Sequence, residues 1–303
     1  MSQTYKATGI NLKSIPLGES DRILTILTRE HGLIRVAAPG ARKPKSKLGG
    51  RGELFVVNDL LLSKGRSLER LVQAERVASF PALSRDLAKL TVAQYWAEMI
   101  LHQTLDHDPT DTLFEWFCAQ LSVLAEASGG TVMLVHLTRG IFNLLHLSGI
   151  LPQVNRCCLT GQLVDPQLLG HRKVIFSPKA GGIVLPTDQV PDNGRRGHDW
   201  SAQAAFPRQF GPRPEGATAL VLSAQELNLM QQLARSIALQ SESPSELPSP
   251  DLSPLLDSVS VWLNIERALR AYVSYHIERP IRSAELLDSC FSQTPLAVSP
   301  VTS

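Results

Sequence analysis

Residues 5–79 contain short apolar runs separated by turn signals, which is the pattern of β-strands. The expected strands, rich in Ile, Leu, Val and Thr, are 5–15, 22–28, 33–38, 53–63 and 68–79. Five short strands with antiparallel turns favour a small closed barrel, because closure removes the exposed edges of a sheet. A five-stranded OB barrel is the preferred architecture, and an SH3-like barrel or an open meander would give a similar pattern.

Beyond residue 81 the apolar positions recur every three or four residues, which indicates helices. This spacing predicts helices over 91–105, 113–124, 134–145 and 254–278. Another helix is expected to open at Ser223, because Ser223 and Glu226 have the spacing of a capping box. Its buried face would carry Leu227, Met230, Leu233 and Ile237. In the last helix, His276 lies on the same predicted face as the apolar residues.

Two segments have compositions that disfavour a packed core. Residues 186–216 hold five prolines and four glycines, and residues 241–254 form a Ser- and Pro-rich linker. The predicted organisation is an OB domain at 1–80, a helical domain in two parts at 81–155 and 219–291, an insertion with its loop at 156–218, and a flexible tail at 292–303.

Charge is divided unevenly along the chain, although the net charge is only +2. Residues 1–80 hold 14 basic and 7 acidic residues, whereas residues 81–303 hold 16 basic and 21 acidic ones. Five of the cations lie in the Gly-containing stretch 40–52, which has no acid and too few apolar residues to pack. Such a loop favours binding to phosphates. It is not a Walker loop, because Lys45 stands where the second glycine is required.

Catalytic motifs are missing from the sequence, which has no His-Glu-x-x-His, Gly-x-Ser-x-Gly or Gly-x-Gly-x-x-Gly. The densest acid–base cluster, Asp106-His107-Asp108, precedes a proline, and helix capping is its favoured role. Glu266 is expected to form a structural ion pair with Arg270, four residues on. Three histidines are expected to be partly buried rather than ligands: His136, His146 and His276. A hydrolase or transferase would require turnover that is abolished by a change such as His107→Ala.

The four cysteines, at 118, 157, 158 and 290, form no regular disulfide framework, which is typical of a reducing compartment. A zinc site needs four ligands, usually from two Cys-x-x-Cys arms, and the adjacent Cys157 and Cys158 have no second arm. No cofactor is therefore expected. No apolar run approaches the roughly 18 residues of a membrane-spanning helix, and no signal core is visible at the N-terminus, so a cytoplasmic location is expected.

Four segments resemble, in order, the signatures of the bacterial recombination mediator family RecO. The first is the stretch 25–33 with the basic loop 40–48 after it. The others are Leu-Leu-His-Leu-Ser-Gly-Ile-Leu-Pro at 144–152, Phe-Ser-Pro-Lys-Ala-Gly-Gly at 176–182 and Leu-Arg-Ala-Tyr-Val-Ser-Tyr-His-Ile-Glu-Arg-Pro-Ile-Arg-Ser at 269–283. Their shared order over nearly the whole chain makes the resemblance specific.

The resemblance implies an α+β multidomain protein, with an N-terminal OB-fold barrel followed by an α-helical domain that carries a zinc-ribbon-like insertion. It implies a non-enzymatic, nucleoid-associated mediator of DNA repair that binds single- and double-stranded DNA and anneals complementary strands. RecR, the acidic C-terminal tail of single-strand binding protein and, indirectly, RecA are the implied protein partners. The insertion departs from zinc-bearing members at Cys157-Cys158 and at 183–185, where the cysteine arms are incomplete or missing, so loss of the metal is expected.

The phosphate backbone is expected to bind the barrel and its loop. The candidate DNA contacts there are Arg22, Arg35, Arg42, Lys43, Lys45, Lys47, Arg51 and Arg66. Candidates on the helical body for DNA or an acidic tail are Arg139, Arg156, Arg267 and Arg270. Aromatic residues are few in the barrel, and both Tyr5 and Phe55 are expected in its core, so binding should depend strongly on salt. The alternative function is a protein-interaction scaffold whose basic barrel docks an acidic partner and binds DNA weakly.

Overall fold

The structure is a computed structural model that describes residues 3–44, 46, 48–65, 68–104, 111–186, 219–242 and 258–291. The chain divides into two compact units. Unit 1 comprises residues 1–128 and 282–303, and unit 2 comprises residues 129–281. Unit 1 is therefore built from two separate stretches of sequence.

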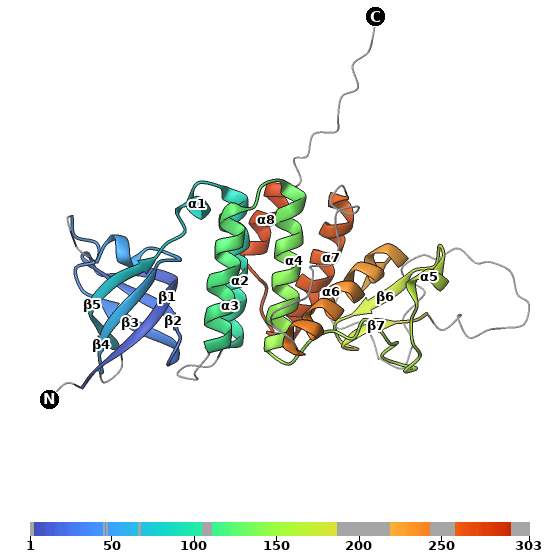
Figure 1. Ribbon diagram of the computed structural model, residues 1–303, viewed down its shortest axis with the longest axis horizontal. Helices are drawn as coiled ribbons and strands as arrows, with labels where there is room; N and C mark the ends of the chain where they lie inside the picture. The colour runs from blue at the N-terminus through green and yellow to red at the C-terminus, as the bar shows by residue number, and fades with distance from the viewer. Residues whose placement is uncertain are drawn as a thin grey trace, which may run out of the picture. The chain divides into compact units, whose positions relative to one another are not determined.

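Unit 1 begins with a closed five-stranded barrel, drawn in blue in Figure 1. Its strands are β1 (Thr4–Leu17), β2 (Asp21–Thr28), β3 (Gly32–Ala38), β4 (Val57–Ser63) and β5 (Glu69–Ala78). They close in the order β1-β2-β3-β5-β4, and every pair is antiparallel except β3 with β5. The predicted OB barrel is confirmed, and closure excludes the open meander.

The barrel interior is filled by alternate residues of the five strands, as a half-buried strand pattern requires. The buried interior cluster consists of Ala7, Leu24, Ile26, Ile34, Val36, Ala38, Ala41, Leu60, Leu62, Leu71 and Ala74. Ala41 comes from the β3–β4 connection, so this connection covers one end of the barrel. Tyr5 is partly buried against the same cluster.

The predicted start of β4 was four residues too early. Residues 50–52 form a short 3₁₀ helix, η1 (Gly50–Gly52), and Phe55 has a φ of 60°, which no regular strand contains. Phe55 is buried but does not belong to the interior cluster. Its ring lies 6.2 Å from that of Phe117, so Phe55 is buried as predicted but packs against α3 rather than within the interior cluster.

Gly9 of β1 lies where no side chain fits. A Cβ at this position would stand 2.6 Å from Cγ2 of the buried Ile26. We expect Gly9→Ala to lower the free energy of unfolding by about 1–3 kcal/mol, which is typical of overpacking in a closed core. Gly50→Ala is the control for urea unfolding, because a Cβ there would meet no atom within 4 Å. Equal stability of the two variants would show that β1 can move aside at no cost.

The α-helices in the described part of unit 1 are α1 (Pro81–Ser84), α2 (Leu87–Gln103), α3 (Asp111–Glu126) and α8 (Ser283–Phe291). Asp86 caps α2 by accepting hydrogen bonds from the backbone N–H groups of Ala88 and Lys89 at 2.9 and 3.2 Å. Arg29 of the β2–β3 turn pairs with Glu115 of α3. This ion pair and the Phe55–Phe117 contact join the barrel to α3. The cluster at 106–108 lies outside the described residues.

Helix α8 was not predicted as a separate element, because it is short and follows a proline. The carboxylate of Glu98 on α2 accepts hydrogen bonds at the start of α8 from the backbone N–H groups of Arg282 and Ser283, at 2.9 and 3.0 Å. It also accepts one from the Ser283 hydroxyl at 2.8 Å. Ala284, Leu287 and Phe291 are buried along α8. A single carboxylate therefore caps and positions this helix on α2.

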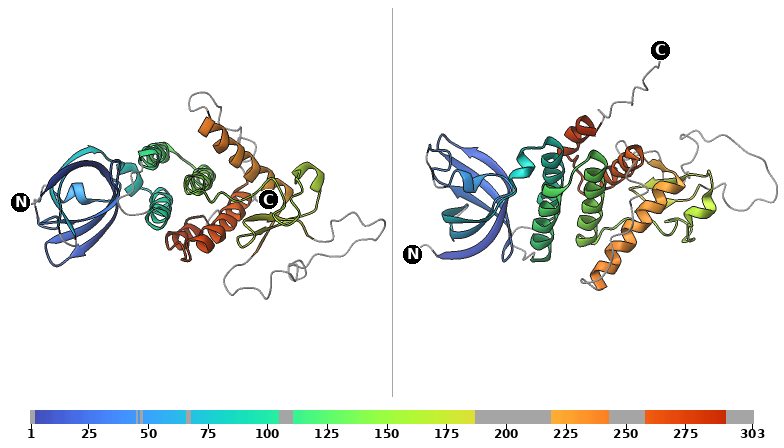
Figure 2. Two further views of the ribbon diagram at one scale, coloured as in Figure 1. Left: turned by 90° about the horizontal axis from the view of Figure 1, so that it is seen from below. Right: turned by 45° about the horizontal axis from the view of Figure 1, so that its top comes forward.

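Unit 2 consists of helices and a small sheet, which lie side by side in Figure 2. Its helices are α4 (Gly130–Leu147), α5 (Pro166–Leu169), α6 (Ala224–Glu242) and α7 (Val259–His276). The sheet has the order β7-β6-β8, from β6 (Val174–Ser177), β7 (Gly182–Val184) and β8 (Leu220–Leu222).

The capping box at the start of α6 is confirmed. The backbone N–H of Ser223 donates to Glu226 Oε2 at 2.7 Å, and the N–H of Glu226 donates to Ser223 Oγ at 3.3 Å. The four apolar residues predicted for the buried face of this helix are all buried. His276 is exposed at the end of α7, so its placement on the buried face was wrong. Trp262, Leu269 and Val273, which were predicted on that face, are buried there together with Ile265 and Tyr272.

Candidate nucleic-acid interface

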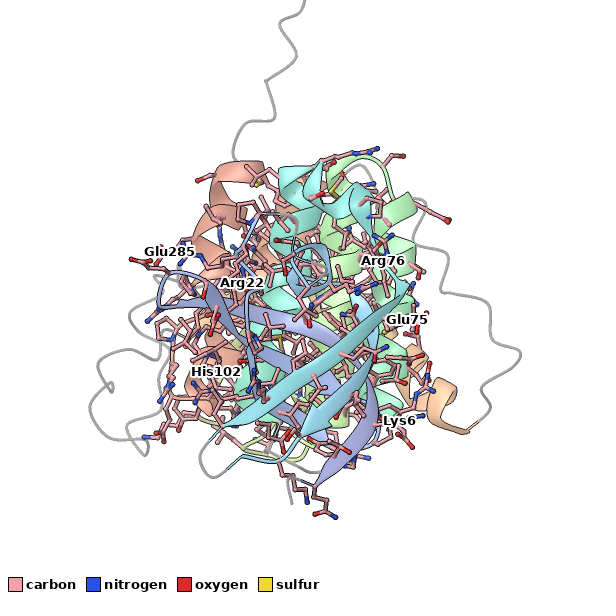
Figure 3. The ribbon with its side chains drawn as sticks, turned by 90° about the vertical axis from the view of Figure 1, so that its left-hand side faces the viewer. Lys6, Arg22, Glu75, Arg76, His102 and Glu285 are labelled. Carbon is pink, nitrogen blue, oxygen red and sulfur yellow. The ribbon has the colours of Figure 1, made fainter. Side chains whose placement is uncertain are left out.

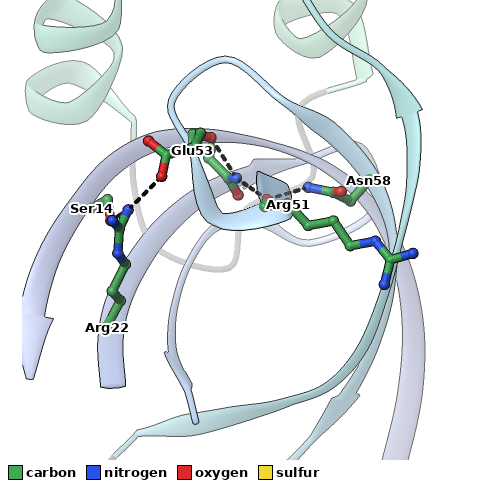
Figure 4. A network of polar contacts seen from close by, with 6 residues as sticks. Ser14, Arg22, Arg51, Glu53 and Asn58 are labelled. Carbon is green, nitrogen blue, oxygen red and sulfur yellow. Dashed lines mark hydrogen bonds and ion pairs between the residues drawn. The ribbon is translucent and has the colours of Figure 1, made fainter. Parts of the chain in front are cut away.

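The end of the basic β3–β4 connection is held by two buried asparagines (Figure 4). Asn11 and Asn58 both donate a side-chain N–H to the carbonyl oxygen of Arg51, at 2.7 and 3.0 Å. Asn11 also donates to the carbonyl of Glu53 at 2.9 Å. Because the asparagines bind backbone atoms, they fix the path of η1 and leave the Arg51 side chain to extend away from it.

The beginning of the same connection is bound to the β1–β2 turn. The Asp21 carboxylate accepts a hydrogen bond from the N–H of Gly40 at 2.8 Å, and Arg42 donates from Nη1 to the carbonyl of Gly18 at 2.7 Å. The Gly40 hydrogen bond is the main cause of a lowered pKa at Asp21, followed by the Ser20 hydroxyl and by the charges of Lys43 and Arg70. Lys43 and Arg70 therefore lie near Asp21, so cations of the connection and of β5 meet at this corner.

Two rows of side chains extend from that corner across the outside of the barrel. The first row, in register across β1, β2 and β3, is Lys13, Thr25 and Arg35. The second row is Ile15, Ile23 and Ala37, and Arg70 of β5 is the partner of Ala37. Residues directly opposite one another point to the same side of a sheet, and both rows alternate with interior residues. They form a single outer surface.

We call this surface the basic barrel face and define it by five exposed cations: Lys13, Arg35, Arg42, Lys43 and Arg70. Between the cations runs an apolar strip in which Ile15 and Leu17 are 38% and 40% exposed. The acids at its edge are Asp21, which is engaged with Gly40, and Glu19 in the β1–β2 turn. The face offers several positive charges around a short row of apolar side chains. This arrangement suits a single nucleic-acid strand whose phosphates contact the cations and whose bases contact the apolar side chains.

The sequence-predicted contacts of the barrel are distributed unevenly around this face. Arg35, Arg42 and Lys43 belong to it. Arg22 instead forms an ion pair with Glu53 at 3.2 Å and donates to Ser14 (Figures 3 and 4). Arg51 is half-buried, with its backbone held as described above. Lys45, Lys47 and Arg66 lie outside the described residues.

Sequence reasoning missed Lys13 and Arg70. Neither belongs to a local basic motif: Lys13 is the second cation of β1, and Arg70 lies in β5 among charges of both signs. The signal that would have found them is the strand register. Thr25 and Ala37 alternate with the buried Leu24 and Val36, so they and their cross-strand partners Lys13 and Arg70 lie on the outer surface.

The candidate arginines of unit 2 do not form one cluster. Arg270 binds the fully buried Glu266 at 2.6 Å, which confirms the predicted structural ion pair. Arg156 is exposed and donates to the carbonyl of Gly161 at 3.1 Å, and Arg267 is exposed on α7. Arg139 is half-buried on α4, and burial lowers its pKa.

The predicted insertion carries Cys157, a candidate metal ligand. Its sulfur accepts a hydrogen bond from the backbone N–H of Leu185 at 3.3 Å, so the loop at Cys157 meets the residue that follows β7. Burial tends to raise the pKa of Cys157, but hydrogen bonds from Leu185, Thr160 and Leu159 lower it overall. Across the part of the chain that the structure describes, no three His, Cys, Asp or Glu side chains gather as metal ligands. This donor set does not fit tetrahedral zinc.

Among the described residues, no helix is both long and apolar enough to cross a membrane.

Comparison with known proteins agrees with the barrel and the helical region. Residues 1–80 match the family model described as recombination protein O N terminal, and residues 84–241 match the one described as recombination protein O C terminal. The chain is 48% identical to DNA repair protein RecO of Acaryochloris marina over 97% of this chain and 98% of that protein. It is 46% identical to DNA repair protein RecO of a Cyanothece species, over 99% of this chain and 100% of that protein. The chain therefore belongs to the recombination protein O family.

Proposed function

We propose that this protein acts in DNA repair as a non-enzymatic mediator that binds DNA through the basic barrel face. The observation that carries the proposal is the gathering of five exposed cations from β1, β3, β5 and the β3–β4 connection on one side of a closed OB barrel. The relatives named above, which carry the name DNA repair protein, support the repair role. No cofactor is required, because charge neutralisation alone supplies the affinity.

Binding is expected to rest on phosphates more than on stacking. Phe55 is turned to Phe117, and Tyr5 lies at the barrel interior, so neither offers a platform on the face. The exposed apolar strip at Ile15 and Leu17 is available to bases of any sequence. Two strands held on one cationic surface repel each other less, so the same face would favour annealing of complementary strands.

Arg139 is the best placed residue of unit 2 for an acidic peptide. It is half-buried, and no described carboxylate pairs with it, so burial leaves its charge without compensation. His136 lies three residues before it, on the same side of α4, and has a lowered pKa from burial and from the Arg139 charge. We infer that the acidic tail of single-strand binding protein contacts α4 here. Cooperation with RecR and the loading of RecA belong to the same proposal.

The test is a titration of labelled single-stranded DNA with the full chain, without partners, across a salt series. If all five cations of the face neutralise phosphates, the slope of log affinity against log salt should be roughly −3.5, since each contact on a single strand contributes about −0.7. A thymine 30-mer and a mixed sequence without guanine should bind alike. If naked DNA does not bind at moderate salt, the scaffold function replaces this proposal.

A further inference from the structure

The starts of β1 and β5, the β2–β3 turn and the residues after β4 border a cavity that DNA binding to the outer face does not use. Its volume is about 450 Å³, and it is lined by Gln3, Tyr5, His31, Lys64, Gly65 and Glu69. This volume is within the range of small-molecule sites, roughly 300–1,000 Å³. We call it the barrel mouth. Gln3 and Lys64 are exposed at its rim, whereas Tyr5, His31 and Glu69 are half-buried within it.

Tyr5, His31 and Glu69, the half-buried lining residues, combine two aromatic rings with one hydrogen-bond acceptor, the Glu69 carboxylate. The rings of Tyr5 and His31 lie 4.8 Å apart at 86°, edge to face. The Tyr5 hydroxyl donates to Oε2 of Glu69. Burial, reinforced by this bond, raises the pKa of Tyr5, which keeps the phenol protonated. Among the described residues, Oε1 of Glu69 accepts no hydrogen bond, so acceptor capacity of the carboxylate remains for a ligand.

The mouth adjoins the basic barrel face at the contact between β3 and β5. Glu69 is the register partner of Val36, and the next pair along the parallel strands is Arg70 with Ala37. Arg35 precedes Val36 in the chain. Arg35 and Arg70 are the chain neighbours of this pair but point to the opposite side of the sheet, so a base of a DNA strand that they hold would have to turn inward to reach Glu69.

We propose that the barrel mouth binds one unpaired guanine base of the strand that lies on the basic barrel face. This inference deepens the proposed function and rests on it. Guanine alone among the DNA bases presents two adjacent N–H donors, at N1 and N2, to a single carboxylate. Glu69 accepts both, the Tyr5 and His31 rings border the base, and the Lys64 ammonium at the rim donates to O6 or to the adjoining phosphate.

The other bases and a bare phosphate fit the mouth less well. Thymine places carbonyl oxygens on both sides of its N–H, which would face the negative charge of Glu69. Adenine and cytosine offer a single amino group. A phosphate at the floor of the barrel mouth would be repelled by the negative charge of Glu69. We therefore expect phosphates to bind on the basic barrel face and a base to bind in the barrel mouth.

The test compares a 30-mer of alternating dT and dG with one of alternating dT and dA, by fluorescence anisotropy on the full chain. Wild type should bind the guanine strand about tenfold more tightly, at the low end of what a bidentate base contact contributes. Glu69→Gln should abolish the preference for the guanine strand. It should keep the hydrogen bond of the Tyr5 hydroxyl, which can donate to the amide oxygen of the glutamine. Glu75→Gln, an exposed carboxylate of the same strand β5, removes the same charge and should keep the preference (Figure 3).

A second measurement separates this inference from the proposed function. Titration of the protein with dGMP, dAMP or dTMP is followed by the NMR signals of the His31 ring. Shifts with dGMP that disappear in Glu69→Gln support the mouth, even if neither oligonucleotide binds and the DNA-binding proposal fails. Equal affinity for both oligonucleotides together with an unmoved His31 signal overturns the guanine site and leaves the basic barrel face intact.

Discussion

Reversing the charges of Lys13 and Arg35 is expected to weaken binding to single-stranded DNA by about 25-fold at 0.1 M salt, because each lost phosphate contact removes about 0.7 log units there. Both residues are exposed and in register on the basic barrel face. The double variant Lys13→Glu/Arg35→Glu should also flatten the salt slope by about 1.4. Fluorescence anisotropy across the salt series measures both quantities on the same sample.

The matched control reverses Lys6 and Arg76, two exposed cations on the other flank of the same barrel (Figure 3). Lys6 is the partner of Leu61, and Arg76 is the partner of Asn58, so both belong to the β1–β4–β5 side. This variant changes the net charge equally and should lose little affinity beyond the general electrostatic term. Equal losses in the two double variants would mean that DNA senses only the total charge, and the basic barrel face would not be the site.

Replacing Phe55 with alanine should lower the free energy of unfolding of unit 1 by about 3–5 kcal/mol, the usual cost of deleting a buried aromatic ring. The ring is 3% exposed and contacts Phe117 on α3, so its loss empties the junction between the barrel and the helices. Urea unfolding followed by fluorescence measures the loss, since Trp96 and Trp116 lie in α2 and α3.

The backbone of Phe55 supplies a control that ordinary truncation lacks. Phe55 has a φ of 60°, which glycine adopts without strain, whereas any L-residue is strained there by roughly 1–2 kcal/mol. Phe55→Gly should therefore be no less stable than Phe55→Ala, the reverse of the usual order within a strand. Phe80→Ala, at a half-buried phenylalanine, should cost clearly less. If the free energy of unfolding of Phe55→Gly were well below that of Phe55→Ala, the backbone strain at residue 55 would be absent in solution.

The barrel was predictable because its strands largely alternate between a packed interior and an outer surface, apart from bulges in β1 and β5. The errors lie where tertiary contacts override local pattern. Residues 53–56 are as apolar as a strand, yet the hydrogen bonds of Asn11 and the contact of Phe55 with α3 hold them in another conformation. Helix α8 is fixed by Glu98, which is 184 residues from Arg282 in sequence, so no local signal marks where it begins.

The sequence predicted that the candidate site would be a basic surface of the barrel, but it did not predict correctly which residues form that surface. The excess of cations in residues 1–80 pointed to the barrel, and Arg35, Arg42 and Lys43 do lie on one face. Arg22 has the same local appearance, but Glu53 of the β3–β4 connection pairs with it. Lys13 and Arg70 join the face only through strand register. The barrel mouth could not be predicted, because it gathers side chains from three separate turns and strand ends.

Unit 1 is built from residues 1–128 and 282–303, so it cannot be completed on the ribosome until the end of the chain has been translated. Helix α2 emerges early, but the residues that cover it, Ala284, Leu287 and Phe291, are translated after the whole of unit 2. Until then Glu98 lacks the N–H groups it binds at the start of α8, and an apolar side of α2 faces water. A nascent chain stopped before residue 282 thus carries a complete barrel on an unfinished helical layer, which makes it a substrate for chaperones and proteases rather than a functional shorter protein.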